Sequence, residues 1–371
     1  MPPQRYTIHR GGKQLEDLAT TCQLPPSADA YTHHRHYGYK RKDYYQGTDV
    51  HRTFANSQRA LYLGKFEQSH RCSPHLASPA PEHDLAVVEM GASHPGDIKE
   101  LVEIAEPDYG IITNVGKAHL EGFGSFEGII KTKGEMYDYL RTRKEATIFI
   151  HNDNPYLKKI AYGLHQIAYG SEDGLYINGH VTGNSPYLTF EWKTDNESKY
   201  HEVQTRLIGE YNFPNALAAV TIGHFFGVEP EKIDKALAGY TPQNNRSQLK
   251  KTADNTLIID AYNANPTSMM ASISNFRNMQ AENKMLILGD MRELGKDSAD
   301  EHQKIADYLE ECGFKDVVLV GELFAATRHS YQSYPDVTAL IAELQREKPC
   351  GKTILIKGSN GIKLSSVVEY L

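Results

Sequence analysis

Cysteine is scarce in this chain, and its four cysteines are Cys22, Cys72, Cys312 and Cys350. They lack the paired spacing of a zinc site and are too few for a disulfide framework. The N-terminal segment has no apolar run like that of a signal peptide, and nothing later approaches the roughly 18 apolar residues of a membrane-spanning helix. We therefore expect a soluble, cytoplasmic protein without stable membrane insertion.

An excess of positive charge is also missing, because the formal net charge is -7. Proteins that bind nucleic acids usually carry a basic patch or stripe, so the composition predicts no nucleic-acid partner. One stretch departs from the rest of the chain: residues 31–45 are rich in histidine, tyrosine and basic residues and have no periodicity. Taken alone, this stretch is typical of a disordered basic arm.

Short apolar runs, of the kind that form buried parallel strands, recur from about residue 82 onward. They fall at residues 84–89, 110–114, 146–150, 256–260, 284–288, 316–320 and 353–357, and helical spacing separates most of them. Residues 176–203 alternate like antiparallel strands instead. The pattern predicts an α/β protein with two parallel sheets, a central domain over residues 81–243 and a C-terminal, Rossmann-like domain over residues 244–371.

Polar side chains end two of the predicted central strands. Glu89 and Asn114 stand at strand ends, and His119 follows in the next loop. Ligands of open α/β sheets bind at the carboxyl ends of the strands, and a carboxylate beside an imidazole suits a Mg²⁺ that bridges nucleotide phosphates. Either residue alone is more simply interpreted as a helix cap or a loop histidine.

The sequence motifs around these residues resemble those of the Mur ligase family, and the resemblance extends from about residue 81 to the end of the chain. They are residues 113–124, residues 131–135 and the helix start at 207–219. The resemblance implies magnesium-site and catalytic roles for Glu89 and His119, and for Lys133 as a lysine that becomes carbamylated. A carbamate turns a cation into an anion that can hold a metal. Sequence alone favours a surface helix lysine.

The same resemblance implies the nucleotide-binding residues. Asn114 and Asn215 would bind ATP, Asn215 at the adenine, although a helix cap is its simpler interpretation. Arg246 matches the family arginine that reaches the phosphates, a role that suits its planar five-donor side chain. Asp260, at a strand end, would bind ribose hydroxyls.

In the C-terminal part, residues 260–266 are the most diagnostic motif. Residues 288–295, with His302 after them, and residues 357–361 resemble the members of the family that add D-alanyl-D-alanine. Asn360 departs from the pattern, which usually has arginine there. The resemblance implies a set of substrate-binding residues, namely Tyr262, Asn263, Asn265, Asp290, Glu293, His302, Lys357 and Ser359.

A glycine-rich phosphate loop, Gly-x-x-Gly-Lys-Thr, is absent from the printed chain, although ATP-dependent members of this family need one. It should precede Glu89, inside residues 1–80. Read one nucleotide out of frame, residues 33–49 permit a strand, a phosphate loop and a helix start, and residues 64–75 permit a second family motif. We therefore predict two compensating frameshifts, and an N-terminal domain that is mostly missing. The loss of a central strand would expose the edge of residues 85–88.

The resemblance implies an ATP- and Mg²⁺-dependent ligase of peptidoglycan precursor synthesis, a monomer that joins UDP-N-acetylmuramoyl-tripeptide to D-alanyl-D-alanine through an acyl phosphate. Two alternatives remain open. One is a folate polyglutamate-type ligase, which residues 260–266 and 289–295 disfavour. The other is an inactive ligase remnant, which the out-of-frame segment favours for the literal chain.

Overall fold

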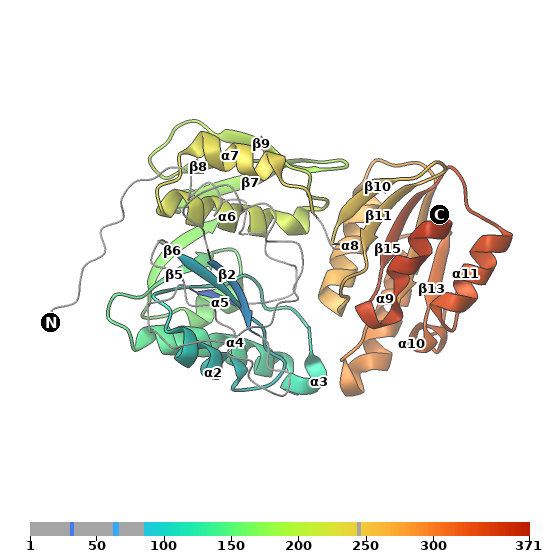
Figure 1. Ribbon diagram of the computed structural model, residues 1–371, viewed down its shortest axis with the longest axis horizontal. Helices are drawn as coiled ribbons and strands as arrows, with labels where there is room; N and C mark the ends of the chain where they lie inside the picture. Colours follow the sequence, from blue (N-terminus) through green and yellow to red (C-terminus); the bar gives the residue numbers. More distant parts are fainter. Residues whose placement is uncertain (1–29, 33–61, 67–84, 243–245) are drawn as a thin grey trace, which may run out of the picture.

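The computed structural model describes residues 30–32, 62–66, 85–242 and 246–371, and they form two lobes, each built on one sheet (Figure 1). The first sheet has the order β2-β3-β1-β4-β5-β6-β7-β8-β9. Its strands are β1 (Ala30–Thr32), β2 (Tyr62–Phe66), β3 (Ala86–Met90), β4 (Tyr109–Ile112), β5 (Thr147–His151), β6 (His165–Gly170), β7 (Ile177–Asn184), β8 (Leu188–Thr194) and β9 (His201–Gln204). The predicted α/β class is confirmed.

Helices cover both faces of the first sheet. They are α2 (Asp97–Ala105), α3 (Leu120–Phe123), α4 (Phe126–Arg141), α5 (Pro155–Ile160), the 3-10 turn η2 (Glu210–Asn212), α6 (Phe213–Phe225) and α7 (Pro230–Gly239). On one face α2 and α4 bury Val88, Ile112 and Leu140 in a shared core. On the other, α6 packs against the long antiparallel strands through residues such as Phe190 and Leu217.

The antiparallel part of the first sheet is where residues 176–203 predict it, since β7 pairs β8 and β8 pairs β9 antiparallel. Strand β1 is a surprise, because it lies antiparallel between β3 and β4, in a sheet whose neighbouring pairs β2–β3 and β4–β5 are parallel. Strand β3 therefore pairs on both sides, and the expected open edge at residues 85–88 is wrong. Residues 33–49 and 67–75, where the shifted frame predicts family motifs, lie outside the described residues.

The second sheet has the order β10-β11-β15-β12-β13-β14, with only β10 antiparallel to its neighbour among the described strands. Its strands are β10 (Gln248–Lys251), β11 (Thr256–Asp260), β12 (Lys284–Gly289), β13 (Val317–Val320), β14 (Gln332–Tyr334) and β15 (Thr353–Lys357). Its helical elements are α8 (Pro266–Asn278), η3 (Gly295–Asp297), α9 (Ser298–Glu311), α10 (Glu322–Ala325), α11 (Val337–Arg346), η4 (Asn360–Ile362) and η5 (Leu364–Tyr370).

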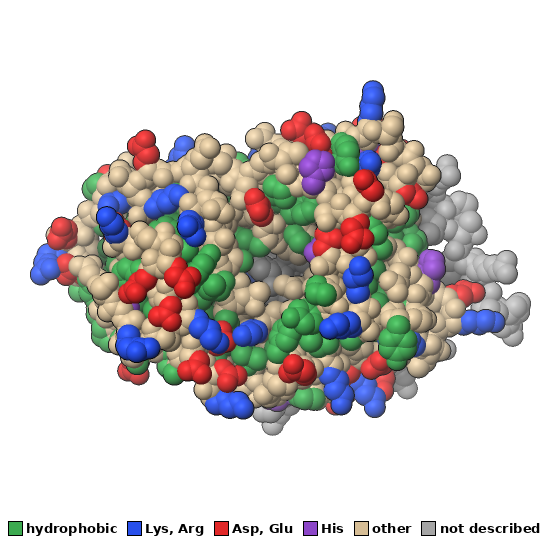
Figure 2. All heavy atoms as spheres, turned by 180° about the vertical axis from the view of Figure 1, so that it is seen from behind, with side chains coloured by type: hydrophobic (Ala, Val, Ile, Leu, Met, Phe, Trp, Pro, Cys, Tyr) green, Lys and Arg blue, Asp and Glu red, His purple; other side chains and the backbone are tan. Residues whose placement is uncertain are grey.

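The lobes meet where α3 of the first approaches the loop before α9 of the second (Figure 1). Leu120 and Phe123 of α3 belong to the same apolar cluster as Met291 and Leu294. Viewed from behind, the surface is hollowed between the lobes, and acidic and basic side chains are interspersed over that face (Figure 2). Within the described part of the chain, no helix is long and apolar enough to cross a membrane.

The close approach of α4 to β4 depends on Gly110. A Cβ at this position would lie 2.5 Å from Met136 Sδ and 2.6 Å from Leu140 Cδ1. Because α4 carries Lys133, this contact also sets the position of a candidate site residue. In contrast, a Cβ at Gly134 would lie 3.6 Å from Ile160 Cδ1, an ordinary contact distance.

We expect Gly110→Ala to lower the free energy of unfolding by about 1–3 kcal/mol, because an extra methyl group overpacks this interface. The matched control is Gly134→Ala, which should raise it by about 0.5–1 kcal/mol, as alanine does inside a helix. Urea denaturation of both variants measures the difference. Equal stabilities for the two would show that α4 does not press on β4 as described.

Candidate active site

Lys133 is buried at the ends of the central strands. It lies on α4, which begins after Ser125, whose hydroxyl accepts a hydrogen bond from the Gly128 N–H. Lys133 is only 4% exposed to solvent, and its Nζ donates to the Asn114 carbonyl at 3.3 Å. The structure thus brings together Lys133 and Asn114, and the alternative of a surface lysine is wrong.

His119 faces the second lobe. It adopts a left-handed backbone conformation (φ 52°) just before α3, and its Nδ1 pairs with the Glu293 carboxylate. The Glu121 N–H also donates to the Glu293 carbonyl at 3.2 Å. Glu89 is half-buried at the end of β3. The described residues contain no group of three or more His, Cys, Asp or Glu side chains that could hold a metal by itself.

Two of the four predicted nucleotide-binding residues, Asn215 and Arg246, lie on different elements. Asn215, in the first turn of α6, donates from Nδ2 to Asn212 Oδ1 at 3.5 Å. Asn212 in turn donates to the Ile208 carbonyl at 2.8 Å. Arg246 is half-buried and its guanidinium carbon lies 3.9 Å from the centre of the Tyr262 ring, a cation–π contact that fixes both side chains.

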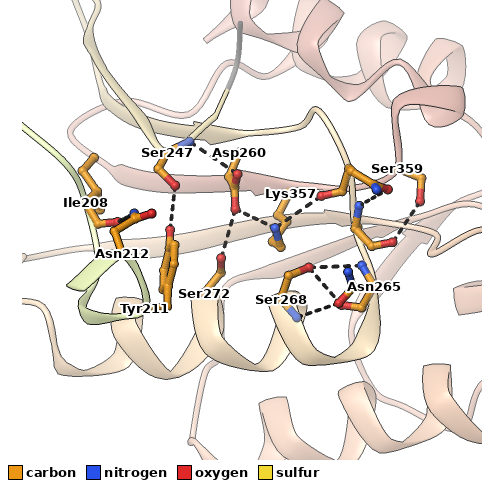
Figure 3. Close-up of polar contacts among 12 residues, drawn as sticks. Ile208, Tyr211, Asn212, Ser247, Asp260, Asn265, Ser268, Ser272, Lys357 and Ser359 are labelled. Atoms are coloured by element: carbon orange, nitrogen blue, oxygen red, sulfur yellow. Dashed lines mark hydrogen bonds and ion pairs between the residues drawn. The ribbon is translucent and has the colours of Figure 1, made fainter. Parts of the chain in front are cut away.

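Asp260 is the centre of a buried network (Figure 3). Its Oδ2 accepts from Lys357 Nζ at 2.5 Å and from the Ser272 hydroxyl at 3.1 Å, and its Oδ1 accepts from the Ser247 N–H at 3.4 Å. The Ser247 hydroxyl also bonds the Tyr211 hydroxyl at 2.8 Å. Both carboxylate oxygens are therefore engaged within the chain, and the contact of Asp260 with a ribose stays a prediction.

Burial and the nearby Asp260 carboxylate raise the pKa of Tyr211 above its ordinary value, which keeps this tyrosine neutral. Tyr211 comes from η2 of the first lobe, whereas Ser247 lies near the start of the second. The hydroxyl contact between them therefore connects the lobes through the network.

Asn265 begins α8 with a reciprocal cap. Its Oδ1 accepts from the Ser268 N–H at 2.9 Å, and the Ser268 hydroxyl pairs with the Asn265 N–H at 3.1 Å. The preceding Asn263 accepts from the Ala264 N–H at 2.8 Å, and its carbonyl lies 3.4 Å from Lys357 Nζ. These contacts hold the turn in place, with Tyr262 exposed beside it.

His302 and Asp290 are both buried. His302 Nε2 accepts from the Met291 N–H at 3.0 Å, which places the ring proton on Nδ1, facing the Ser298 carbonyl at 2.7 Å. Burial lowers the His302 pKa, in keeping with a neutral ring. Asp290 accepts from the N–H groups of Leu323 and Phe324 at 3.1 and 2.9 Å, so it caps α10. Both residues shape the loop that follows β12.

Ser359 connects two loops of the second lobe. Its hydroxyl accepts from the Arg292 N–H at 3.0 Å and lies 3.4 Å from the Ala264 carbonyl, to which it donates. Its own N–H donates to the Asp290 carbonyl at 3.2 Å. The C-terminal string predicted at residues 357–361 thus meets the strings at 260–266 and 288–295 in one place.

Sequence reasoning missed the contacts made by Lys117. Its N–H donates to the Thr267 hydroxyl at 3.2 Å and its Nζ pairs with Glu301 at 3.0 Å. Lys304 also pairs with Glu301, at 2.9 Å. Burial of Glu301 opposes ionisation, but together the two lysines lower the pKa of its carboxyl. Lys117 stands in the string at 113–124, yet only the fold shows that it reaches the other lobe.

Comparison with known proteins matches two family models to this chain. Residues 65–223 match the Mur ligase middle domain and residues 245–360 match the "Mur ligase, glutamate ligase domain". The first match begins inside the segment to which the shifted-frame hypothesis applies. Together the two matches contain the sequence motifs from which the resemblance was inferred, except for Gly361 at the end of the last motif.

Two curated relatives are named UDP-N-acetylmuramoyl-tripeptide--D-alanyl-D-alanine ligase. The protein from Bacillus subtilis is 31% identical over 335 residues, which are 87% of this chain and 72% of that protein. The one from Rickettsia prowazekii is 31% identical over 313 residues, 80% of this chain and 68% of the relative.

A solved structure, MurF from Acinetobacter baumannii, is similar over 78% of this chain and 65% of its own, with a TM-score of 0.68 and 27% identity. The chain thus spans about two thirds of the length of these proteins. Identity of this level over most of the chain, together with the two matched domains, confirms the predicted resemblance. The chain belongs to the Mur ligase family.

Proposed function

We propose that the chain serves the ATP-dependent joining of D-alanyl-D-alanine to UDP-N-acetylmuramoyl-tripeptide. One observation carries this proposal: the strings at 260–266, 288–295 and 357–361, which predict the dipeptide-adding members of the family, converge through Ser359 and Asp290. Relatives that are 31% identical are named for this reaction. The expected monomeric state and cytoplasmic location stay predictions.

In the proposed reaction the terminal carboxylate of the tripeptide becomes an acyl phosphate. The amine of the dipeptide then attacks the acyl carbon, and phosphate leaves. Asn114, Asn215 and Arg246 would hold ATP, whose transferred phosphoryl group needs positioning and neutralisation of charge more than covalent help. Asn215 lies in the first turn of α6, in the first lobe, and Arg246 lies just before β10, where the second lobe begins.

A Mg²⁺ would neutralise phosphate charge, with Glu89, His119 and carbamylated Lys133 as its protein ligands. Mg²⁺ usually keeps several waters and binds through one or two carboxylates plus phosphates, which fits a site that has no complete set of ligands among the described residues. The burial of Lys133 supports the carbamate, because a buried ammonium beside a cation would be unfavourable.

Some of the residues predicted to bind nucleotide or substrate are better explained as positioning residues. Asp260 holds Lys357, and His302 and Asp290 shape the loop after β12, all with side chains that are almost fully buried. Tyr262 and Glu293 are exposed and remain the better candidates for direct contact. The turn that carries Tyr262 would be held in place by three other predicted residues, namely Asn263, Asn265 and Ser359.

An inactive remnant is the second candidate, and one observation favours it. The printed chain has no Gly-x-x-Gly-Lys-Thr string, which wraps ATP phosphates with backbone N–H groups. A folate polyglutamate-type ligase is less well supported, because the relatives described above are named for the dipeptide reaction.

The decisive assay supplies ATP, UDP-N-acetylmuramoyl-tripeptide and D-alanyl-D-alanine to two chains, one as printed and one with the shifted frame restored. We expect ADP and the pentapeptide product, detected by mass spectrometry, only from the restored chain, since only it would have the phosphate loop. Product from the printed chain would rule out the remnant. Product with glutamate and folate instead would overturn the proposed substrates.

Lys133→Ala in the restored chain should abolish ADP release, and added short carboxylic acids should restore part of it by supplying the lost anion. The matched control is Lys131→Ala on the exposed side of the same helix, which should keep the parent rate. Rates of ADP release with and without acetate provide the measurement. If the Lys133 variant is fully active without any added acid, the carbamate is wrong.

Asp260→Asn should lower the free energy of unfolding by about 3–5 kcal/mol, because it leaves the Lys357 ammonium buried without a counter-charge. Asp254→Asn is the control, since Asp254 pairs with Lys348 at 2.8 Å on the surface and such pairs contribute about 0–1 kcal/mol. Both are measured by chemical denaturation. Similar losses for the two variants would show that burial does not strengthen the dependence of Lys357 on Asp260.

A further inference from the structure

Arg292 is an exposed arginine whose backbone is held in place. It follows Met291 in the loop after β12, and its N–H donates to the hydroxyl of the buried Ser359 at 3.0 Å. Met291 is anchored in turn by His302. The backbone that carries the Arg292 side chain is therefore held by two buried groups.

The guanidinium of Arg292 lies against Gly361. A Cβ on Gly361 would be 2.8 Å from Nη1, 2.9 Å from Cζ and 3.0 Å from Nε of Arg292. Gly361 is not among the glycines with a positive φ, so glycine here provides space and not an unusual backbone conformation. The absence of a side chain at 361 lets the planar group rest on the loop that follows β15.

The donors of this guanidinium have no acceptor within the described residues. Among the described residues no carboxylate lies within 4.0 Å of the guanidinium, and its side chain makes no hydrogen bond to them. Glu293 pairs with His119 instead. The neighbouring cation Lys357 is neutralised by Asp260. Arg292 thus presents, from a held backbone, a planar set of N–H donors whose charge no described carboxylate neutralises.

The loop that carries Arg292 also reaches the contact between the lobes. Glu293, the next residue, pairs with His119, and its carbonyl accepts from the Glu121 N–H at 3.2 Å. His119 is the proposed metal-site residue of the first lobe. An anion bound by Arg292 would therefore lie against the C-terminal lobe, on the loop that also supplies Glu293 to His119.

We propose that Arg292 binds the free carboxylate of the D-alanyl-D-alanine acceptor. The proposal rests on the function proposed above and assigns the residue that recognises the end of the dipeptide that does not react. A guanidinium offers two parallel N–H groups to a carboxylate, a geometry that gives orientation as well as affinity. Anchoring that end would leave the amine of the dipeptide free to attack.

The test compares D-alanyl-D-alanine with D-alanyl-D-alaninamide, which has the same amine but lacks the terminal carboxylate. Isothermal titration of the full chain with each ligand should show about 10- to 100-fold tighter binding of the dipeptide, as expected for a charge-assisted pair. Arg292→Gln should remove this preference by weakening only the dipeptide. Arg277→Gln, an exposed arginine at the end of α8, should preserve it.

Gly361→Ala gives an independent check, because it keeps the arginine and displaces the end of its flexible side chain. It should reduce the preference without unfolding the chain. A parent chain that binds both ligands equally, or neither, overturns the assignment, as does an unchanged preference in Arg292→Gln. If Arg292→Gln instead weakens the binding of ADP, the guanidinium binds phosphate and the assignment is wrong. The ligation assay above tests the reaction separately.

Discussion

The buried ion pair between Asp260 and Lys357 is the interaction on which the C-terminal lobe depends. The two residues are direct neighbours in the parallel register of β11 and β15, at the carboxyl ends of both strands. Their charges lie at 2.5 Å with side chains only 5% and 1% exposed. Because a buried charge without a partner is costly, each residue restricts the other, and the loops that leave both strands begin from a fixed point.

From that point the constraint spreads to both lobes. Asp260 also accepts hydrogen bonds from the Ser272 hydroxyl on α8 and from the Ser247 N–H at the start of the second lobe. Ser247 in turn contacts Tyr211 of the first lobe. On the opposite side, Lys117 and His119 reach Glu301 and Glu293. Asn184 of β7 also donates to Asn275 of α8, so the lobes are joined by polar contacts at several places. This arrangement suits two bodies that must present different ligands to one another.

Sequence patterns predicted the parallel strands that are continuous apolar runs, whose type does not depend on distant contacts. The patterns missed the more polar parallel strands β6 and β14. The patterns failed where tertiary contacts decide. Lys133 has the sequence context of a surface lysine, and its burial depends on the close packing of α4 onto β4. His302 falls in a string that resembles a substrate site, yet both of its nitrogens serve the backbone. No local signal separates these cases.

The distribution of charge explains why Arg292 escaped attention in the sequence. The string at 288–295 contains an aspartate, an arginine and a glutamate close together, which in sequence alone indicates mutual neutralisation. In the structure Asp290 turns inward to cap α10, and Glu293 turns toward His119. Because both carboxylates interact with other elements, neither neutralises the charge of the arginine between them. A fold can therefore leave a binding group available by directing the neighbouring carboxylates to other partners. Only the positions of α10 and of the first lobe show that Arg292 is such a group.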